Sequence, residues 1–335
     1  MPTRVLSPTE IRKLLPMDAC VDLMAEALMT LGRDDAINPL RNGIRLPNDL
    51  GLLGMMPGYM EQPHTFGLKV VSVFPGNHGT DFDSHQGVVV LFEVEHGFPV
   101  AILDASEITA IRTAAATGVA TRLLAREDAS DLAILGSGVQ AKTHLEAMRV
   151  VRNIDRVRVY SPNAERLERF VTEARERHGI DVTATSSAQA AVDSADIICT
   201  TTSAREPILM GQWIASGSHI NAVGSSVRFT RELDTDAVVR SRLFVDRLES
   251  ALNEAGDFLF PKQEGAIDDG HIVGEIGDIL LGKLPGRESP DEITLFKSLG
   301  LAVEDLAAAD YVYKRAEAEG VGTTVDLGGF KHAPT

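Results

Sequence analysis

Two patterns of apolar and polar positions divide the chain near residue 130. Between residues 50 and 104, apolar runs broken by glycine and proline predict a meander or mixed sheet, and the Ala/Thr-rich stretch 106–126 predicts a long helix leading into the next domain. From 131 onward, short apolar runs alternate with helix-like periodicity, which is typical of a doubly wound parallel sheet. The strands expected there are 132–135, 156–160, 196–200, 219–223 and 243–246, and the helices are 139–150, 163–177, 186–194 and 232–240.

Helices are also predicted towards the two ends of the chain. Ser7, Pro8 and Glu10 form a helix start, because a serine followed three residues later by glutamate can satisfy the first free amides. After residue 300, the stretch LAVEDLAAADYVYKRAEAEG has the pattern of one more amphipathic helix. The Gly-, Asp- and Pro-rich stretch 259–292 is predicted to be the longest loop.

Composition narrows the possible partners. The chain has 335 residues with 32 basic and 48 acidic side chains, a net charge of −16, which argues against a nucleic-acid or anionic-membrane partner. No segment approaches the roughly 18 uninterrupted apolar residues of a membrane span. The two cysteines, Cys20 and Cys199, lie too far apart in sequence for a disulfide framework or zinc site, so we expect reduced thiols in a cytoplasmic protein.

A glycine-rich loop follows the first strand of the alternating region. In LAILGSGVQAKTHL, Gly136, Gly138 and Ala141 have the spacing of a dinucleotide-binding loop between a strand and a helix. Gly136 allows the tight turn, Gly138 lets the backbone approach a pyrophosphate, and the helix N-terminus supplies amide donors. The candidate ligand-binding residues here also include Ser137, Val139 and Gln140. The alternative is a tight strand-to-helix turn that binds nothing.

The end of the second strand bears on the choice of nucleotide. NAD sites usually carry an acidic residue near this position for the ribose 2′-hydroxyl, whereas this chain has Ser161, Asn163 and Arg166. No carboxylate would repel a 2′-phosphate, which favours NADP(H) within an NAD(P)H site. The alternative is that SPN merely caps the next helix.

Two serines end another expected strand. The apolar run HINAV stops at Val223 and Gly224 and is followed by Ser225 and Ser226. Ligands bind at the carboxyl ends of strands in open α/β sheets, so these residues are candidates for facing a ligand.

Three basic residues lie in apolar or small-residue surroundings, namely Arg41, Lys69 and Arg112. A charge is costly to bury unless it is paired. Each residue can therefore be a structural ion pair or an outward-pointing side chain. Together they can instead form an anion site, in which arginine clamps a carboxylate and lysine donates a proton or polarises a C=N or C=O group. Arg45 is a further candidate close to Arg41.

The stretch PGNHGTDFDSHQG is rich in aspartate and histidine, with His78, Asp81, Asp83 and His85. Its spacing matches no known metal-ligand pattern. We therefore predict a polar loop and no metal site.

With these residues in place, the chain resembles the ornithine cyclodeaminase/mu-crystallin family over nearly its whole length. The resemblance is carried by Arg41 and by GLKVVSVFPGN, HQGVVVLFEVEHGFPVAILDASEITAIRTAAATGVAT, LGSGVQAKTHL, HINAVGSS with RELD, LFVDRLESALNEAGDF, EIGDILLGK and TLFKSLGLAVEDLAAA. It implies an α/β protein with a Rossmann domain at 121–299. It also implies a discontinuous α+β substrate-binding and dimerisation domain, formed by 1–120 with 300–335.

The resemblance further implies a homodimer that transfers hydride between NAD(P)H and the Cα of an amino acid or its imine. Arg41 and Arg112 would grip the substrate carboxylate, and Lys69 would support proton transfer. Thr113 would lie near the cofactor phosphates, and Val223 and Gly224 would lie beside the nicotinamide. The candidate cofactor-binding residues also include Thr200, Ser225 and Ser298.

One position departs from the cyclodeaminase pattern. Family cyclodeaminases carry an aspartate where this chain has Ser226, whereas ketimine reductases similar to mu-crystallin have serine there. A serine is too weak a base to process an amine unaided, but it can hydrogen-bond a substrate nitrogen. We therefore expect an imine reductase, acting on a cyclic ketimine such as pyrroline- or piperideine-2-carboxylate or on an acyclic imine of a 2-oxo acid. The alternatives are an ornithine or lysine cyclodeaminase and a nucleotide-dependent small-ligand binding protein.

Overall fold

The structure, a computed structural model, describes residues 2–77 and 80–329, so the predicted polar-loop residue His78 lies outside it. The chain divides into two units, one of residues 1–112 with 301–335 and the other of residues 113–300. The boundaries expected from the sequence lie after residues 120 and 299. As expected, the long Ala/Thr-rich helix, α3 (Ala105–Leu124), carries the chain from the first unit into the second.

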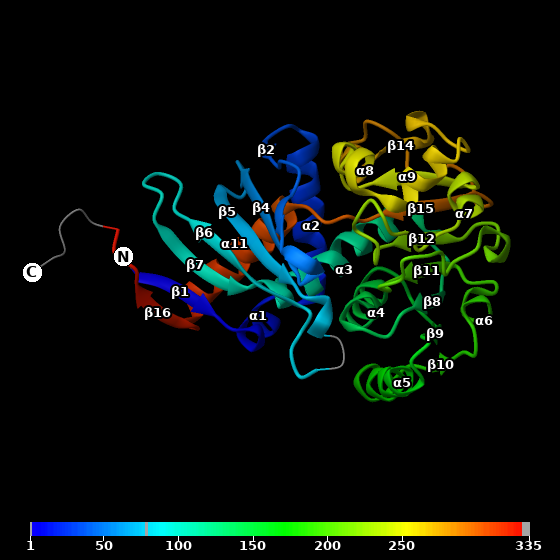
Figure 1. The fold of residues 1–335 in the computed structure, drawn as a ribbon, viewed down its shortest axis with the longest axis horizontal. Coiled ribbons are helices and arrows are strands. Elements are labelled where there is room, and N and C mark those ends of the chain that lie inside the picture. The colour runs from blue at the N-terminus through cyan, green and yellow to red at the C-terminus, as the bar shows by residue number, and fades with distance from the viewer. Residues whose placement is uncertain (1, 78–79, 330–335) are drawn as a thin grey trace, which may run out of the picture. The chain divides into compact units, whose positions relative to one another are not determined.

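The first unit is built around an eight-stranded mixed sheet (Figure 1). Its strands follow the order β16-β1-β7-β6-β5-β4-β2, with β3 also paired to β4. Strands β4 to β7 form the predicted antiparallel meander, and β1 adds to it in parallel. The elements are β1 (Pro2–Leu6), α1 (Pro8–Leu14), α2 (Met17–Gly32), β2 (Ala36–Ile37), β3 (Asn42–Arg45), β4 (Leu52–Met60), β5 (Thr65–Val73), β6 (His85–Phe92), β7 (Pro99–Asp104), α11 (Ala302–Glu319) and β16 (Thr323–Asp326).

Helix α11 packs on the central strands β4, β5 and β6 of this sheet. Because side chains alternate between the two faces of a strand, every second residue points towards the helix. Met56, Lys69, Val89 and Leu103 are neighbours in register across four strands, and all four are buried. The fold therefore places one lysine in a row that is otherwise apolar.

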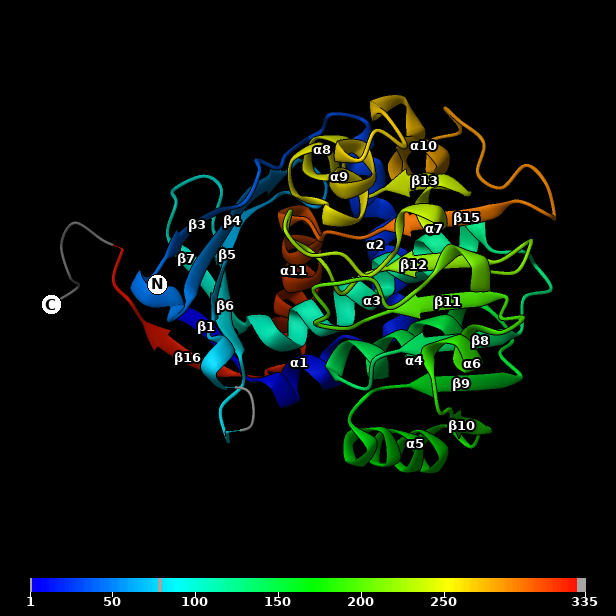
Figure 2. The ribbon, with the colours of Figure 1, turned by 45° about the vertical axis from the view of Figure 1, so that its right-hand side comes forward.

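The second unit is a doubly wound sheet of eight parallel strands (Figure 2). The strand order is β10-β9-β8-β11-β12-β15-β13-β14, so the direction of winding reverses between β8 and β11. The helices and strands are β8 (Asp131–Leu135), α4 (Val139–Val151), β9 (Arg156–Tyr160), α5 (Ala164–His178), β10 (Val182–Ala184), α6 (Ala188–Val192), β11 (Ile197–Thr200), β12 (His219–Ala222), α7 (Thr235–Val239), β13 (Ser241–Val245), α8 (Leu248–Glu254), α9 (Gly256–Gln263), β14 (Ile272–Glu275), α10 (Ile276–Leu280) and β15 (Ile293–Lys297).

The five expected strands of this unit are all present, whereas the loop predicted over 259–292 is wrong in part. That stretch contains the end of α9, the strand β14 and the helix α10. These elements are short, and β14 pairs only with β13 at one edge of the sheet. Glycines and a proline inside them hide their periodicity in the sequence. No helix in the described part of the chain is long and apolar enough to cross a membrane.

Candidate active site

The carboxyl ends of four neighbouring strands in the second unit meet in one row. Leu135 of β8, Thr200 of β11, Ala222 of β12 and Lys297 of β15 are successive partners in register. The reversal of winding between β8 and β11 lies in the same row. In doubly wound sheets this is where ligands bind, outside the carboxyl ends of the strands.

The glycine loop leaves the row directly after Leu135. Gly136 has a φ of 121°, and a side chain there would lie 2.8 Å from the Thr201 carbonyl oxygen, so the turn requires glycine. Gly138 is the N-cap of α4, and among the described residues no side chain caps that helix start. Its first amides are therefore available to an anion, as the dinucleotide-binding motif requires.

Two buried polar atoms beside this edge have no hydrogen-bond partner within the described part of the chain. They are Oε1 of Gln140, in the first turn of α4, and Oγ of Ser298, directly after β15. Buried polar groups are nearly always satisfied, so such atoms indicate a missing partner. A dinucleotide offers phosphate, ribose and carboxamide groups, and the residues present fit such a ligand.

The tip of the second strand combines a helix cap with a cationic side chain. Asn163 caps α5, because its Oδ1 accepts the Arg166 amide at 2.9 Å. Ser161 is half-buried, while the Asn163 and Arg166 side chains are exposed. The alternative reading of SPN as a cap is thus realised at Asn163, and the Arg166 guanidinium extends from the same turn.

The serine segment after β12 shows how each candidate is placed. The Ser225 side chain is buried and its hydroxyl contacts the carbonyl and hydroxyl oxygens of Thr230 at 2.6 and 2.7 Å, so it holds its own loop together. Ser226 is half-buried and Val223 is buried. The Thr200 hydroxyl donates to a Glu232 carboxylate oxygen at 2.7 Å.

The first unit contains a buried cluster of alternating charge. Lys69 Nζ lies 2.7 Å from Asp305 Oδ2, and Arg112 donates to Asp305 Oδ1 at 2.8 Å and to Glu304 Oε2 at 2.6 Å. Both cations are about 4% exposed and both carboxylates are fully buried. The ion-pair alternative for Lys69 and Arg112 is therefore realised, and a substrate-binding role for them remains a prediction.

The surroundings of Lys69 lower the pKa of its ammonium group towards neutral pH. Burial lowers the pKa of Lys69 to about 8, Arg112 and Arg41 lower it as well, and Asp305 opposes them. For Arg112, burial alone would lower the pKa, but the two carboxylates raise it above its ordinary value. One cation of the pair is thus able to release a proton near pH 8, and the other keeps its charge.

The two arginines of the 41–45 segment are placed differently. Arg41 is half-buried and close enough to Lys69 to affect its pKa. Arg45 is exposed and lies 3.2 Å from Asp49 on the surface. The first unit therefore brings Arg41, Lys69 and Arg112 into one electrostatic neighbourhood, and Arg45 contributes to a surface pair.

Helix α3 carries two predicted residues in succession, Arg112 at the end of the first unit and Thr113 at the start of the second. Both side chains are buried. The carboxylate-clamp candidate and the cofactor candidate are thus joined by one peptide bond.

The counter-charges of this cluster were not predicted from the sequence. Glu304 and Asp305 stand in LGLAVEDLAAA, so each is a charge among apolar residues, and the same holds for Lys297 of the second unit, in ITLFKSLG. The rule that singled out Lys69 and Arg112, that a charge in apolar surroundings needs a partner, would have found them too.

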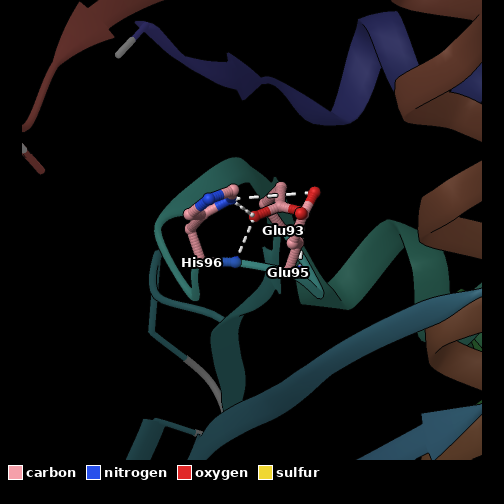
Figure 3. A group of neighbouring side chains, drawn as sticks. All are labelled: Glu93, Glu95 and His96. Atoms are coloured by element: carbon pink, nitrogen blue, oxygen red, sulfur yellow. Dashed lines mark hydrogen bonds and ion pairs between the residues drawn. The ribbon is translucent and has the colours of Figure 1, made fainter.

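A group of Glu93, Glu95 and His96 brings possible metal-ligand atoms within 4.8 Å of one another at the β6–β7 turn. The Glu93 carboxylate accepts the Glu95 amide at 2.7 Å and the His96 amide at 2.6 Å (Figure 3). The group therefore serves the turn between β6 and β7, and we assign no metal to it.

The fold, the glycine loop and the buried charged cluster define the class of protein. It is a dinucleotide-binding protein with a separate unit that contains two buried cations paired with two carboxylates. The chain belongs to the ornithine cyclodeaminase/mu-crystallin family, whose model matches residues 1–320.

Individual relatives are similar along nearly the whole chain. A Δ1-pyrroline-2-carboxylate reductase of Bacillus cereus is 38% identical over 324 residues, covering 96% of this chain and 99% of the relative. The Thermococcus litoralis Δ1-pyrroline-2-carboxylate reductase, solved with NADH and L-proline, is 41% identical with a TM-score of 0.94, covering 96% of this chain and 100% of the other. An archaeal alanine dehydrogenase dimer with bound NAD is 32% identical with a TM-score of 0.92, covering 98% and 100%.

Proposed function

We propose that this chain is an NAD(P)H-dependent reductase that transfers hydride to the imine carbon of an α-imino acid. The first candidate substrate is Δ1-pyrroline-2-carboxylate, which would give proline. Support comes from the Bacillus and Thermococcus relatives, which carry this activity in their names at 38% and 41% identity.

The observation that carries the proposal is the buried pair of cations beside two carboxylates. An α-imino acid offers one carboxylate and one basic nitrogen. Arg112, assisted by Arg41, holds the carboxylate, since a guanidinium matches its geometry. Lys69, whose pKa is about 8, gives the proton that makes the imine a better hydride acceptor.

Binding of the nucleotide is assigned to the carboxyl edge of the second unit. The amides of residues 137–140 hold the pyrophosphate, with Thr113 nearby, and Thr200, residues 223–225 and Ser298 contact the nicotinamide end. When bound, the reduced nicotinamide supplies the hydride. Ser226 is the candidate hydrogen-bond partner of the substrate nitrogen, and no carboxylate takes its place to process an amine.

The decisive experiment follows NADH or NADPH absorbance with pyrroline-2-carboxylate, piperideine-2-carboxylate and a 2-oxo acid mixed with an amine. Consumption that depends on the imine supports the reductase. Ammonia release from ornithine or lysine without net cofactor use would show a cyclodeaminase instead. Cofactor binding without any turnover would show a ligand-binding protein.

NADP(H) is proposed as the preferred cofactor, because Ser161, Asn163 and Arg166 offer hydrogen-bond donors and one cation at the second strand tip. Arg166→Ala is expected to raise the KM for NADPH severalfold and to leave that for NADH unchanged. Equal effects on the two cofactors would contradict the preference.

A homodimer is proposed as the working assembly, with the face of the first sheet that α11 does not cover as the interface. Phe66, Leu68, Val70, Val88 and Phe92 lie on this face, and the two phenylalanine rings pack 5.8 Å apart. Phe66 and Val88 are 44% and 38% exposed. Sedimentation should give a dimer, and Val88→Glu should shift it towards monomer. An unchanged dimer would move the interface elsewhere.

The location proposed is the cytoplasm, since Cys20 and Cys199 are both buried free thiols. Cell fractionation tests this.

A further inference from the structure

A second buried charge network lies under the carboxyl edge of the nucleotide-binding unit. Lys297, Asp257 and Glu232 are each at most 2% exposed. Lys297 Nζ lies 2.9 Å from Asp257 Oδ2 and also donates to the Ala222 and Ser225 carbonyls. Its three protons thus have three partners, in the end of β12, the loop that follows it and α9.

Asp257 connects Lys297 to the backbone of Glu232. Its Oδ1 accepts the backbone amides of Glu232 and Leu233 at 2.7 and 3.0 Å. This fixes the backbone from which the Glu232 side chain extends towards the strand ends.

The Glu232 carboxylate ties the ends of β11 and β12 together. Oε1 accepts the amide and the hydroxyl of Thr202, and Oε2 accepts the Thr200 hydroxyl and the Gly224 amide, all at 2.7 Å. Four donors from two strand ends therefore converge on one carboxylate. Burial and Asp257 raise the pKa of Glu232, while Lys297 and the threonine hydrogen bonds oppose this increase.

Gly224 is the residue that this arrangement holds most tightly. A side chain at Gly224 would lie 2.1 Å from the Thr202 carbonyl oxygen and 2.5 Å from Glu232 Oε1. The backbone of residues 223–225 is therefore held by Glu232 at the Gly224 amide and by Lys297 at the Ala222 and Ser225 carbonyls, with no room for a side chain at Gly224.

We propose that Glu232, Asp257 and Lys297 position the nicotinamide ring for hydride transfer by fixing the backbone after β12. This inference rests on the proposed function, because it assigns residues 223–225 to the nicotinamide end of the cofactor. Glu232 is a positioning residue, since it acts through Thr200 and Gly224.

Glu232→Gln tests the proposal with almost no change in volume. Each carboxylate oxygen accepts one backbone amide, from Thr202 or from Gly224, and backbone amides cannot reverse their direction. Either orientation of glutamine thus sets an NH₂ group against a backbone N–H. We expect the backbone after β12 to shift, with a loss of about 10²-fold in kcat if the ring moves by about 1 Å.

The kinetic pattern separates positioning from general damage. The imine KM and the cofactor Kd should stay within about threefold, because the glycine loop holds the pyrophosphate. The deuterium isotope effect with 4-deuterated cofactor should rise as hydride transfer limits turnover. Thr202→Val, which removes one of the four donors and is not placed at the cofactor, should give the same pattern with a loss of about 3- to 10-fold.

Asp196→Asn is the matched control at the opposite edge of the same sheet. Asp196 also accepts two backbone amides, those of Ser130 and Asp131, each at 3.0 Å. The substitution should lower the melting temperature without changing kcat or the isotope effect. Equal kinetic losses in Asp196→Asn and Glu232→Gln would overturn the proposal, and so would unchanged kcat in Glu232→Gln.

Fluorescence of bound NADH gives a readout that needs no turnover. Glu232→Gln, or Thr202→Val if the first variant does not fold, should bind NADH with altered emission and near-normal affinity. If wild-type protein reduces no imine but this change is seen, the proposed function fails and the positioning role stands. Thr202→Val, which removes a Glu232 donor that is not placed at the cofactor, should change the emission in the same way. Emission identical to that of the wild type in Glu232→Gln and Thr202→Val, or no NADH binding by the wild type, would overturn the positioning role.

Discussion

The two buried charge clusters of the molecule use the same residue types in opposite ways. In the first unit, Lys69 and Arg112 meet Asp305 and Glu304 through side chains alone. In the second unit, the partners of Lys297 include two backbone carbonyls, and Asp257 and Glu232 accept backbone amides. Apart from the Leu301 amide, which donates to Glu304, the contacts described for the first cluster join side chains to one another, whereas the second cluster joins side chains to the main chain.

This difference separates a group that can change its protonation state from groups that hold geometry. The pKa of Lys69 is lowered to about 8 by burial, so its proton can be given up near neutral pH. Lys297 is instead held by Asp257 and by two main-chain carbonyls, so it fixes the geometry of the strand end.

Lys69→Met is expected to have the largest effect on activity, and it tests most directly whether the two clusters differ in function. Loss of the proton donor should lower kcat by about 10²- to 10⁴-fold, measured as imine-dependent NAD(P)H consumption. Cofactor affinity should be unchanged. Arg45→Ala, which removes an exposed arginine of the same unit, is the matched control and should behave as the wild type. Near-normal turnover in Lys69→Met would remove Lys69 from proton transfer.

Lys297→Met tests the second cluster through stability. The variant leaves Asp257 buried without its cation, which is expected to cost about 3–5 kcal/mol of unfolding free energy. Urea unfolding followed by the fluorescence of Trp213, the one tryptophan of the chain, reports on this unit. Lys262→Met removes a surface lysine paired with Asp269 and should cost at most about 1 kcal/mol. Equal losses in the two variants would contradict a structural role for Lys297.

The smallest expected effect is a change in the pH dependence of kcat/KM, which should differ between variants of the two clusters. Protonated Lys69 is the active form, so kcat/KM should fall about tenfold per pH unit above roughly pH 8. Asp305→Asn removes the anion that raises this pKa, so the fall should begin at lower pH. Asp257→Asn should reduce stability and leave the midpoint of the profile in place. A shift of the profile in both variants would show that the two clusters are not separate in function.

Strong periodicity made most of the second unit predictable from sequence. The expected strands 132–135, 156–160 and 219–223 lie within one residue of β8, β9 and β12. The first is a continuous apolar run, the second alternates valine with arginine, and the third is mostly apolar and ends at a glycine. Strand β14 was missed because four residues with an internal glycine give no readable pattern, and its pairing is tertiary.

The candidate site was predictable where one residue type determines the backbone or carries a conspicuous charge. Gly136 and Lys69 are of this kind. The roles of Glu232 and Asp257 were not, because their partners are backbone amides of distant segments, which no spacing along the chain reveals. The hydrogen bonds of the Ser225 hydroxyl to Thr230 could not be predicted for the same reason.

The discontinuity of the first unit has a consequence for how the protein is made. Arg112 leaves the ribosome nearly two hundred residues before Glu304 and Asp305, the carboxylates that pair with it, and Lys69 leaves earlier still. The nucleotide-binding segment is complete earlier and can fold as a unit during translation. The first unit must instead wait for α11, so this later stretch decides when Lys69 first acquires its buried partner.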